Sequence, residues 1–555
     1  MQETRSKPGT DRALKPAHLF FGLSVLGVLL RLFQLVVAHP FVEGDTTILV
    51  KVHLNAIRAC LHDGRLAGCP DSGVWPLLQH FPSLFLSYLG FSSSSILHAL
   101  AYLSFLSLLG SVLLIYWTLK KKASTALAIT GVLVTITSPL LWYSHSTFGE
   151  MAAAFLILAF TAACLMRAPF LLTAGLFVLA GTTKEIAFPF LLIIGLVCVF
   201  AESPTQVRKK RVTALFAGAA ITIVATVAFN YFRYGTFFNS SYVSNIYLVP
   251  TLKLQLSFFA GIWFSPNGGL GIFWPSFMLL YLAISGAALL RIARQKFSEH
   301  VIGPEQRVFR PYAPLLAITA ILFLLSAGFS RWFTPLGGFA WGPRYLLPWI
   351  PALTLLLIYF YRDELCGILG LILHRRVGLA LGALVVFAVS IPQFSILFGE
   401  SVLARIFAYP ECPRVPVIQE GAAYYFQCLQ TQIWPRRMII LELYRVALKP
   451  PALWLTILCG AVVVTGLLSI RKQLVTDEIS RNASSSIAAS LSATAAMLRR
   501  ATEEPARHCL FVVAFYSLVF VGFFFPAIYQ GHLLAIGGDG SLIYLPNFYS
   551  HKVLW

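Results

Sequence analysis

Long apolar runs separated by short polar segments dominate this chain. A helix needs roughly 20 apolar residues to cross a bilayer, and thirteen runs reach or approach that length. They cover 18–38, 95–118, 124–142, 150–166, 169–183, 186–201, 212–230, 270–291, 312–330, 344–361, 377–397, 451–470 and 508–526. The pattern predicts an all-α polytopic membrane protein with about thirteen transmembrane helices.

The composition agrees with this class. Hydrophobic residues make up 58% of the chain and charged residues only 12%, with a mean hydropathy of +0.77, far from the soluble average. The first run is not read as a signal peptide, because Arg31 and Gln34 interrupt its outer third and more runs follow. An uncleaved first helix is therefore expected.

The basic residues indicate orientation. A net charge of +20 could suggest a nucleic-acid partner, but 26 of the 42 Lys and Arg lie at the amino terminus and in every second loop. The positive-inside rule then predicts a cytoplasmic amino terminus and, with thirteen spans, an outer carboxyl terminus. No nucleic acid is expected as a partner.

The runs and loops divide the chain into three parts. These are a first transmembrane module at 1–230, a second at 231–400 and a last part at 401–555. The first outer loop, 39–94, contains the amphipathic stretch PLLQHFPSLFLSYLGF, which predicts helices lying in the membrane interface. The outer loop 398–450 and the tail 527–555 are expected to form a small outer cap.

Four of the nine cysteines fall in two pairs on predicted outer loops. Cys60 lies near Cys69, and Cys412 near Cys428. In an oxidising compartment such pairs form disulfides that hold loops together. The alternative is four unrelated free thiols.

Carboxylates at the outer ends of helices are the first candidate for chemistry. Asp45, in HPFVEGDTTILV, follows the first run, and Glu150 and Glu185 also lie at helix ends. His145 (WYSHSTFGE) and Lys184 (GTTKE) lie close to them in sequence. A rim of carboxylate, imidazole and ammonium groups suits acid/base chemistry on an anionic lipid-linked substrate, with Asp45 or Glu150 as the catalytic carboxylate.

Each of these residues also has a structural interpretation. Asp45 could stabilise the start of an interfacial helix, and Glu150 could do the same for its own helix. Lys184 and Glu185 could pair across a tight turn. His145 could be a hydrogen-bonded loop residue.

The second candidate is WGPRYLLPWIP at 341–351, where Arg344 opens a helix at the outer face. Unpaired backbone N–H groups at a helix start, together with a guanidinium, make a phosphate site. The alternative is an arginine that snorkels to lipid headgroups within an aromatic belt that includes Tyr345. Arg233 and Arg331 are further candidates for phosphate binding, and Tyr345 is a further candidate for substrate binding.

Several of these features together resemble the GT-C superfamily of membrane glycosyltransferases. They are the outer Asp after the first helix, the long first loop with interfacial helices, the TKE turn, and the stretches NYFRYGTFFNSSY, FSPNGGLGIFWPS and GPRYLLPWIP. The resemblance covers roughly residues 15–360. It is to the bacterial branch that includes protein mannosyltransferases, the aminoarabinose transferase of lipid A and mycobacterial arabinosyltransferases.

The resemblance implies a polyprenyl-phosphate sugar as donor and a hydroxyl of a lipid, glycan or protein as acceptor, with inversion at the anomeric carbon. It implies that Asp45 takes the acceptor proton. Many members carry an acidic pair in the first loop, whereas this chain reads GDTT after Glu43, so the second carboxylate is Glu43, Glu150 or none. It favours the bacterial inner membrane, with the site on the outer face.

The donor phosphate is then expected at Arg344, with Lys184 and with His145 or Arg233. Phosphate is already a competent leaving group, so no catalytic metal or other cofactor is expected, although acidic outer loops could hold a structural calcium. The main alternative is a secondary transporter or lipid flippase, whose functional charges would lie near the bilayer midplane and on both sides. A scaffold subunit of a cell-envelope complex is a third.

Overall fold

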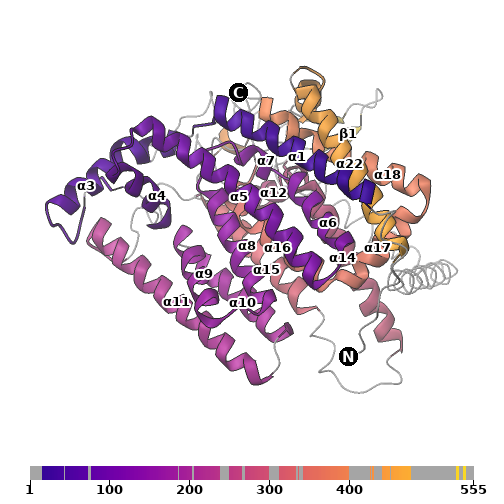
Figure 1. Ribbon diagram of the computed structural model, residues 1–555, viewed down its shortest axis with the longest axis horizontal. Coiled ribbons are helices and arrows are strands. Elements are labelled where there is room, and N and C mark those ends of the chain that lie inside the picture. The colour runs from indigo at the N-terminus through magenta and orange to yellow at the C-terminus, as the bar shows by residue number, and fades with distance from the viewer. Residues whose placement is uncertain are drawn as a thin grey trace.

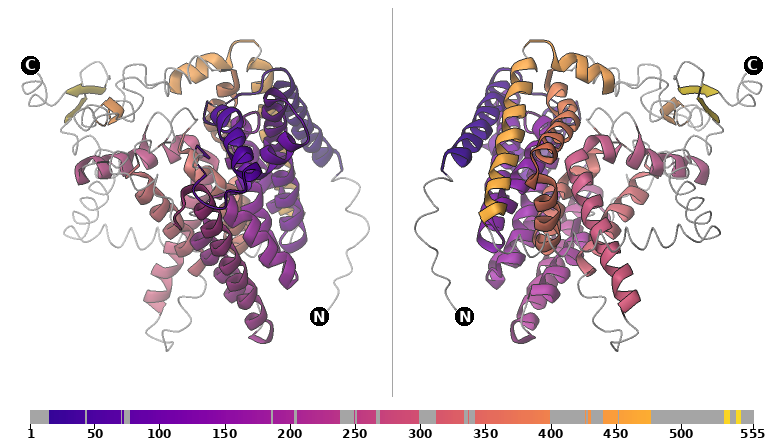
Figure 2. Two further views of the ribbon diagram at one scale, coloured as in Figure 1. Left: turned by 90° about the vertical axis from the view of Figure 1, so that its left-hand side faces the viewer. Right: turned by 90° about the vertical axis from the view of Figure 1, so that its right-hand side faces the viewer.

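The computed structural model is almost wholly helical (Figures 1 and 2). It describes residues 15–42, 44–69, 71–72, 77–184, 187–202, 205–237, 249, 251–265, 269–298, 312–332, 336, 342–398, 426, 428–430, 440–450, 452–476, 533–536 and 542–545. In the first half of the chain the elements are α1 (Lys15–Ala38), α2 (Gly44–Ile48), η1 (Leu49–His53), α3 (Leu54–His62), α4 (Leu77–Tyr88), α5 (Ser93–Lys122), α6 (Thr125–Ile136), α7 (Leu140–Tyr143), α8 (Glu150–Met166), α9 (Phe170–Thr183), α10 (Ala187–Glu202), α11 (Thr205–Tyr234) and α12 (Leu252–Phe264). In the second half they are α13 (Leu270–Phe273), α14 (Pro275–Ser298), α15 (Ala313–Phe329), η5 (Arg344–Trp349), α16 (Ile350–Phe360), α17 (Arg362–His374), α18 (Arg376–Ser395), η6 (Ile396–Phe398), α21 (Ile440–Ala447), α22 (Ala452–Thr476), β1 (Leu533–Ile536) and β2 (Leu542–Leu545).

Most of the predicted spans coincide with one helix, but some are broken. The run 124–142 divides into α6 and α7, because Pro139 disfavours helical backbone at Ser138 and has no N–H to donate. The run 508–526 lies outside the described residues. Conversely, α12 and α17 are helices that lie between the predicted spans, in segments expected to be loops.

Within the part of the chain that the structure describes, five helices are long and apolar enough, by length and composition, to cross a membrane. They cover 16–38, 93–122, 207–234, 376–398 and 452–474, and the other apolar helices are shorter. Many of their large apolar side chains are exposed, as lipid-facing side chains must be. The chain is thus an integral membrane protein, while the count of thirteen spans stays a prediction.

Helix α8 lies at the centre of the first module. It packs against α5, α9, α10 and α16 and against the short helix η5 (Figure 1). Most of its side chains are buried and none is exposed, and the buried ones include that of its first residue, Glu150. This packing brings the start of α8 next to elements from distant parts of the sequence.

The first outer loop is anchored at its disulfide. Cys60 and Cys69 are bonded, which confirms the first predicted pair. The N–H of Cys69 donates to the carbonyl of Phe232 at the end of α11 (2.9 Å). Cys428 is also disulfide-bonded, but Cys412 lies outside the described residues, so this second pairing stays a prediction.

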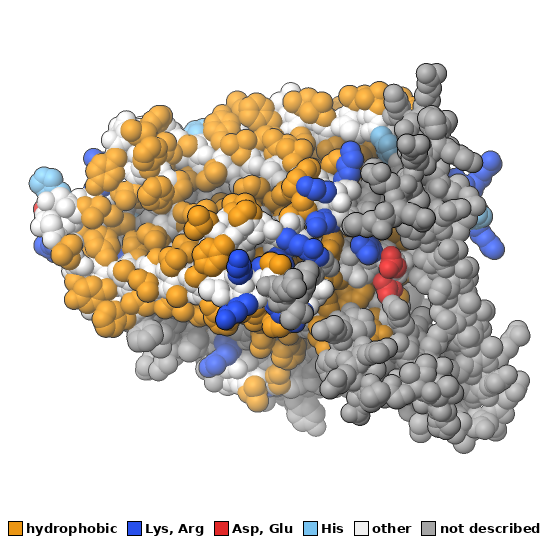
Figure 3. Space-filling view, turned by 60° about the horizontal axis from the view of Figure 1, so that its bottom comes forward, with side chains coloured by type: hydrophobic (Ala, Val, Ile, Leu, Met, Phe, Trp, Pro, Cys, Tyr) orange, Lys and Arg blue, Asp and Glu red, His pale blue; other side chains and the backbone are white. Residues whose placement is uncertain are grey.

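Basic residues gather at the end of the molecule opposite the start of α8. Arg167 caps the carboxyl end of α8, about 25 Å from its first residue at 1.5 Å per residue. The Arg362 guanidinium donates to the carbonyl of Lys122 (3.5 Å), and that of Arg471 to the carbonyl of His374 (3.2 Å). Figure 3 shows Lys and Arg side chains collected on this face among hydrophobic ones. The grouping agrees with the sidedness predicted from the loops.

A short hairpin is an exception to the all-α prediction. Strands β1 and β2 pair antiparallel, with Leu533 opposite Leu545. The sequence between them, GGDGS, has the residues that tight hairpin loops favour. Most of the predicted outer cap, 398–450 with 527–555, lies outside the described residues.

Orientation can be tested by labelling introduced cysteines. Leu66, in the first loop, is 83% exposed, and Lys210, in α11 near the basic end, is also exposed. A membrane-impermeant maleimide added to intact cells should label Leu66→Cys, and should label Lys210→Cys only after permeabilisation. Labelling of the unsubstituted protein gives the background signal from the native cysteines. The reverse pattern would contradict the predicted topology and place the candidate site on the inner face.

Candidate active site

Backbone hydrogen bonds join the segment after α1 to the segment before α8. The N–H of Phe41 donates to the carbonyl of His145 (2.9 Å), and the N–H of Thr147 donates to the carbonyl of Phe41 (3.0 Å). Phe41 and Ser146 form an isolated parallel bridge. The Thr46 hydroxyl donates to the carbonyl of Thr147 (3.4 Å). The first loop is therefore held directly beside the start of α8.

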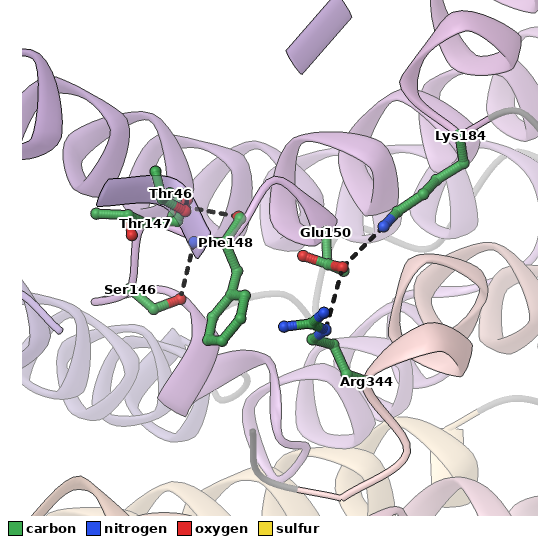
Figure 4. A network of polar contacts seen from close by, with 8 residues as sticks. Thr46, Ser146, Thr147, Phe148, Glu150, Lys184 and Arg344 are labelled. Carbon is green, nitrogen blue, oxygen red and sulfur yellow. Dashed lines mark hydrogen bonds and ion pairs between the residues drawn. The ribbon is translucent and has the colours of Figure 1, made fainter. Parts of the chain in front are cut away.

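At that start, one carboxylate lies between two cations (Figure 4). The Oε1 atom of Glu150 is 2.8 Å from Nζ of Lys184 and 3.5 Å from Nε of Arg344. The side chains are 5%, 21% and 9% exposed, respectively. A charge this deeply buried is costly unless it is paired, so each cation here stabilises the carboxylate. The macrodipole of α8 adds to this, because Glu150 lies in its first turn.

The guanidinium of Arg344 is fixed by aromatic rings. Its central carbon lies 4.9 Å from the ring centre of Phe148 and 5.2 Å from that of Tyr345. Tyr345 in turn stacks on Phe329, with ring centres 4.4 Å apart. Stacking favours a planar cation in one orientation. The interpretation of Arg344 as a snorkelling side chain is therefore wrong, because the side chain is buried against these rings.

The backbone at this helix start differs from the expectation. Arg344 opens a 3₁₀-helix, and its N–H donates to the carbonyls of Leu336 (3.0 Å) and Gly342 (2.8 Å). The N–H of Leu346 donates to the carbonyl of Pro343 (2.9 Å). These two N–H groups are already used, so the positive charge of Arg344, rather than these backbone donors, is what the site offers an anion.

A cavity of about 350 Å³ opens beside the ion pairs. The described residues that line it are Thr46, Leu49, Leu78, Pro82, Leu100, Leu103, Ser107, Thr147, Phe148, Gly149, Glu150, Ala152, Phe155, Leu156, Leu179, Thr183 and Arg344. They come from α2, η1, α4, α5, α8, α9 and η5, and most are apolar. The cavity therefore combines an apolar interior with a charged edge, as pockets for amphipathic molecules do.

Asp45 lies directly beside a cavity-lining residue in the chain. It is the second residue of α2, directly before Thr46, which lines the cavity. Neighbouring Cα atoms are about 3.8 Å apart, so the backbone of Asp45 lies close to a residue of the cavity lining. The Asp45 side chain, Glu43 and Glu185 lie outside what the structure describes, so their proposed roles stay predictions.

Among the described residues, Lys184 and Tyr345 do not line the cavity themselves but contact Glu150 and Arg344, which do. Three further candidates neither line the cavity nor contact these two residues through a side-chain interaction described above. His145 is buried in the loop before α8, where Nδ1 contacts the carbonyl of Trp142 and burial lowers its pKa to about 4. It is neutral at pH 7 and matches the alternative of a hydrogen-bonded loop residue. Arg233 donates to Oδ1 of Asn230 (2.6 Å) within α11, and Arg331 is exposed.

Sequence reasoning missed the apolar part of the site. Phe148 and Phe155 line the cavity, and Phe148 also supports Arg344. The only available signal was the position of Phe148 in TFGE, two residues before the candidate Glu150. No group of three or more His, Cys, Asp or Glu residues that could hold a metal occurs in the described part of the chain.

Comparisons with known proteins add little to this geometry. No protein-family model and no curated protein sequence matches the chain. Two solved structures of ArnT from Cupriavidus metallidurans are similar, each at 14% identity over 84% of this chain. The apo structure has a TM-score of 0.39 over 76% of its chain, and the one bound to undecaprenyl phosphate 0.40 over 77%.

Gly342→Ala tests how Arg344 is positioned. Gly342 has a φ of +68°, and a Cβ there would collide with the ring of Phe273. The left-handed backbone alone costs a residue with a side chain about 1–2 kcal/mol. We expect a lower melting temperature and weaker phosphate binding, measured on purified protein. Gly328→Ala, at the end of α15 with nothing within 4 Å of its Cβ position, is the matched control. If the two substitutions lowered the melting temperature and the phosphate affinity equally, the role of Gly342 in positioning Arg344 would be contradicted.

Proposed function

We propose that this protein is a membrane glycosyltransferase that moves a sugar from a polyprenyl-phosphate donor to a hydroxyl group of a lipid, glycan or protein. The observation that carries the proposal is a cation, Arg344, in the wall of an apolar cavity beside the first loop, with a second cation, Lys184, paired to the cavity-lining Glu150. A polyprenyl phosphate has the same division into an apolar chain and an anionic head. The sequence resemblance to GT-C enzymes points to the same chemistry.

In this proposal the isoprenoid chain lies along the apolar residues of α4, α5 and α8. The phosphate binds near Arg344 and Lys184, whose cations also contact Glu150. Preorganised cations of this kind stabilise the negative charge that develops on a leaving phosphate. Glu150 holds the two cations in place, so its proposed role is to position them.

The transfer itself needs a base on the acceptor. The acceptor oxygen forms a bond to the anomeric carbon while the bond from that carbon to the phosphate oxygen breaks. The leaving group keeps the electron pair as polyprenyl phosphate, and the carboxylate of Asp45 takes the hydroxyl proton. A single displacement of this kind inverts the anomeric carbon. We place the reaction on the outer face of a bacterial inner membrane.

A transporter or lipid flippase is less well supported. Such proteins need charges that line a path across the membrane. Glu150, Lys184 and Arg344 all lie at helix ends, at the end of α8 away from its basic cap. A flippase would bind the same lipid, so the two functions differ in whether a covalent bond is made.

The test is release of polyprenyl phosphate from a donor. Purified protein in liposomes is mixed with a panel of radiolabelled polyprenyl-phosphate hexoses and pentoses and with a crude envelope extract as the source of acceptors. We expect at least one donor to yield free polyprenyl phosphate and labelled acceptor together. Binding or movement of the lipid across the bilayer without release would support the flippase and contradict the enzyme.

A further inference from the structure

We infer that Glu150 makes the phosphate site discriminate between the donor and the lipid product by their charge. This inference rests on the proposed function. The donor is a phosphodiester with one negative charge, whereas the released polyprenyl phosphate is a monoester. The second pKa of a phosphomonoester is about 6, so the product carries close to two negative charges at pH 7.

The geometry places the negative charge of Glu150 against both cations that would hold the phosphate. Lys184 Nζ is 2.8 Å and Arg344 Nε is 3.5 Å from the same carboxylate oxygen. Any anion that contacts both cations therefore comes close to this carboxylate. Glu150 cannot turn away into water, because its side chain is 5% exposed and belongs to the first turn of the packed helix α8.

Coulomb's law gives the direction of the effect. The repulsion between Glu150 and a bound ligand is proportional to the charge of the ligand, so it weakens binding of the dianion twice as much, in free energy, as binding of the monoanion. Burial strengthens this difference, because solvent screens buried charges weakly. Glu150 thus keeps the two cations together for the donor and favours dissociation of the product after transfer.

The experiment compares two probes that differ by one charge, farnesyl phosphate and methyl farnesyl phosphate. Their affinities are measured by calorimetry on the full chain in detergent, without any sugar transfer. At pH 8, Glu150→Gln should raise the affinity for the monoester about tenfold more than the affinity for the diester, a difference of about 1.4 kcal/mol. At pH 5 the monoester has one charge, and the difference between the probes should largely disappear.

Glu150→Asp is the matched control, because it changes the packing but keeps the charge. It should leave the ratio of the two affinities as in the wild type. An equal effect of Glu150→Gln on both probes, or the same change of ratio in Glu150→Asp, would overturn the inference while leaving the proposed function intact. Failure of the wild type to bind either probe would overturn the phosphate site itself, and the inference with it.

If Glu150→Gln does not fold, the wild type alone provides the test. Two cations and one carboxylate leave the site with a net charge of one positive unit, so we expect the wild type to prefer the monoester at pH 8 by less than about tenfold. A preference of about tenfold or more for the monoester would show that the site favours the dianion, and the inference would be wrong.

Discussion

Asp45→Asn is expected to reduce sugar transfer by about 10²–10⁴-fold, the usual contribution of a general base. The amide keeps the size of the side chain and most of its hydrogen bonding but cannot accept the acceptor proton. Donor binding should therefore survive, since the proposed phosphate contacts, Lys184 after α9 and Arg344 in η5, do not lie on α2. The measurement is single-turnover release of polyprenyl phosphate, together with the affinity for the donor.

Asp63→Asn is the control for this change. Asp63 lies in the same loop, is largely exposed and is 3.5 Å from His62, so its loss should leave transfer unchanged. Near-normal transfer by Asp45→Asn would show that another group is the base. Glu43 and Glu150 would then be the next residues to substitute.

Arg344→Ala is expected to weaken donor binding and turnover together. The phosphate is present in both the ground state and the transition state, so losing its cation affects both. Removing one preorganised donor to a developing anion typically costs about 10²–10³-fold in rate. Arg344→Lys should recover only part of the activity, because an ammonium keeps the charge but cannot stack as a plane between Phe148 and Tyr345.

Two controls separate binding from folding. Arg331→Ala removes an exposed guanidinium that follows α15, and it should have little effect on donor binding or on turnover. Arg344→Ala also leaves Glu150 with only Lys184, which should lower the melting temperature. Adding Glu150→Gln should restore the melting temperature but leave donor binding weaker than in Glu150→Gln alone. Recovery of both would mean that Arg344 acts only through stability.

The sequence by itself determined the helices and their class. Apolar runs long enough for a bilayer are a local property of the chain, so α1, α5 and α22 begin within three residues of their predicted starts and end within six residues of their predicted ends. The Cys60–Cys69 disulfide was also predictable, because the two cysteines are close in sequence. Asp45, Glu150, Lys184 and Arg344 were each recognisable as charged residues at helix ends.

Only the tertiary structure decided which of these charges meet. Sequence proximity pointed only to Glu185, which lies outside the described residues, as a partner of Lys184. The structure adds a pairing of Lys184 with Glu150, 34 residues earlier, because α8 and α9 pack side by side. Arg344 joins them through the packing of η5 on α8. The aromatic support of the guanidinium and the apolar cavity arise in the same way. Hydrophobic periodicity specifies the buried face of a helix, but the partner of that face depends on how all the helices fill the interior together.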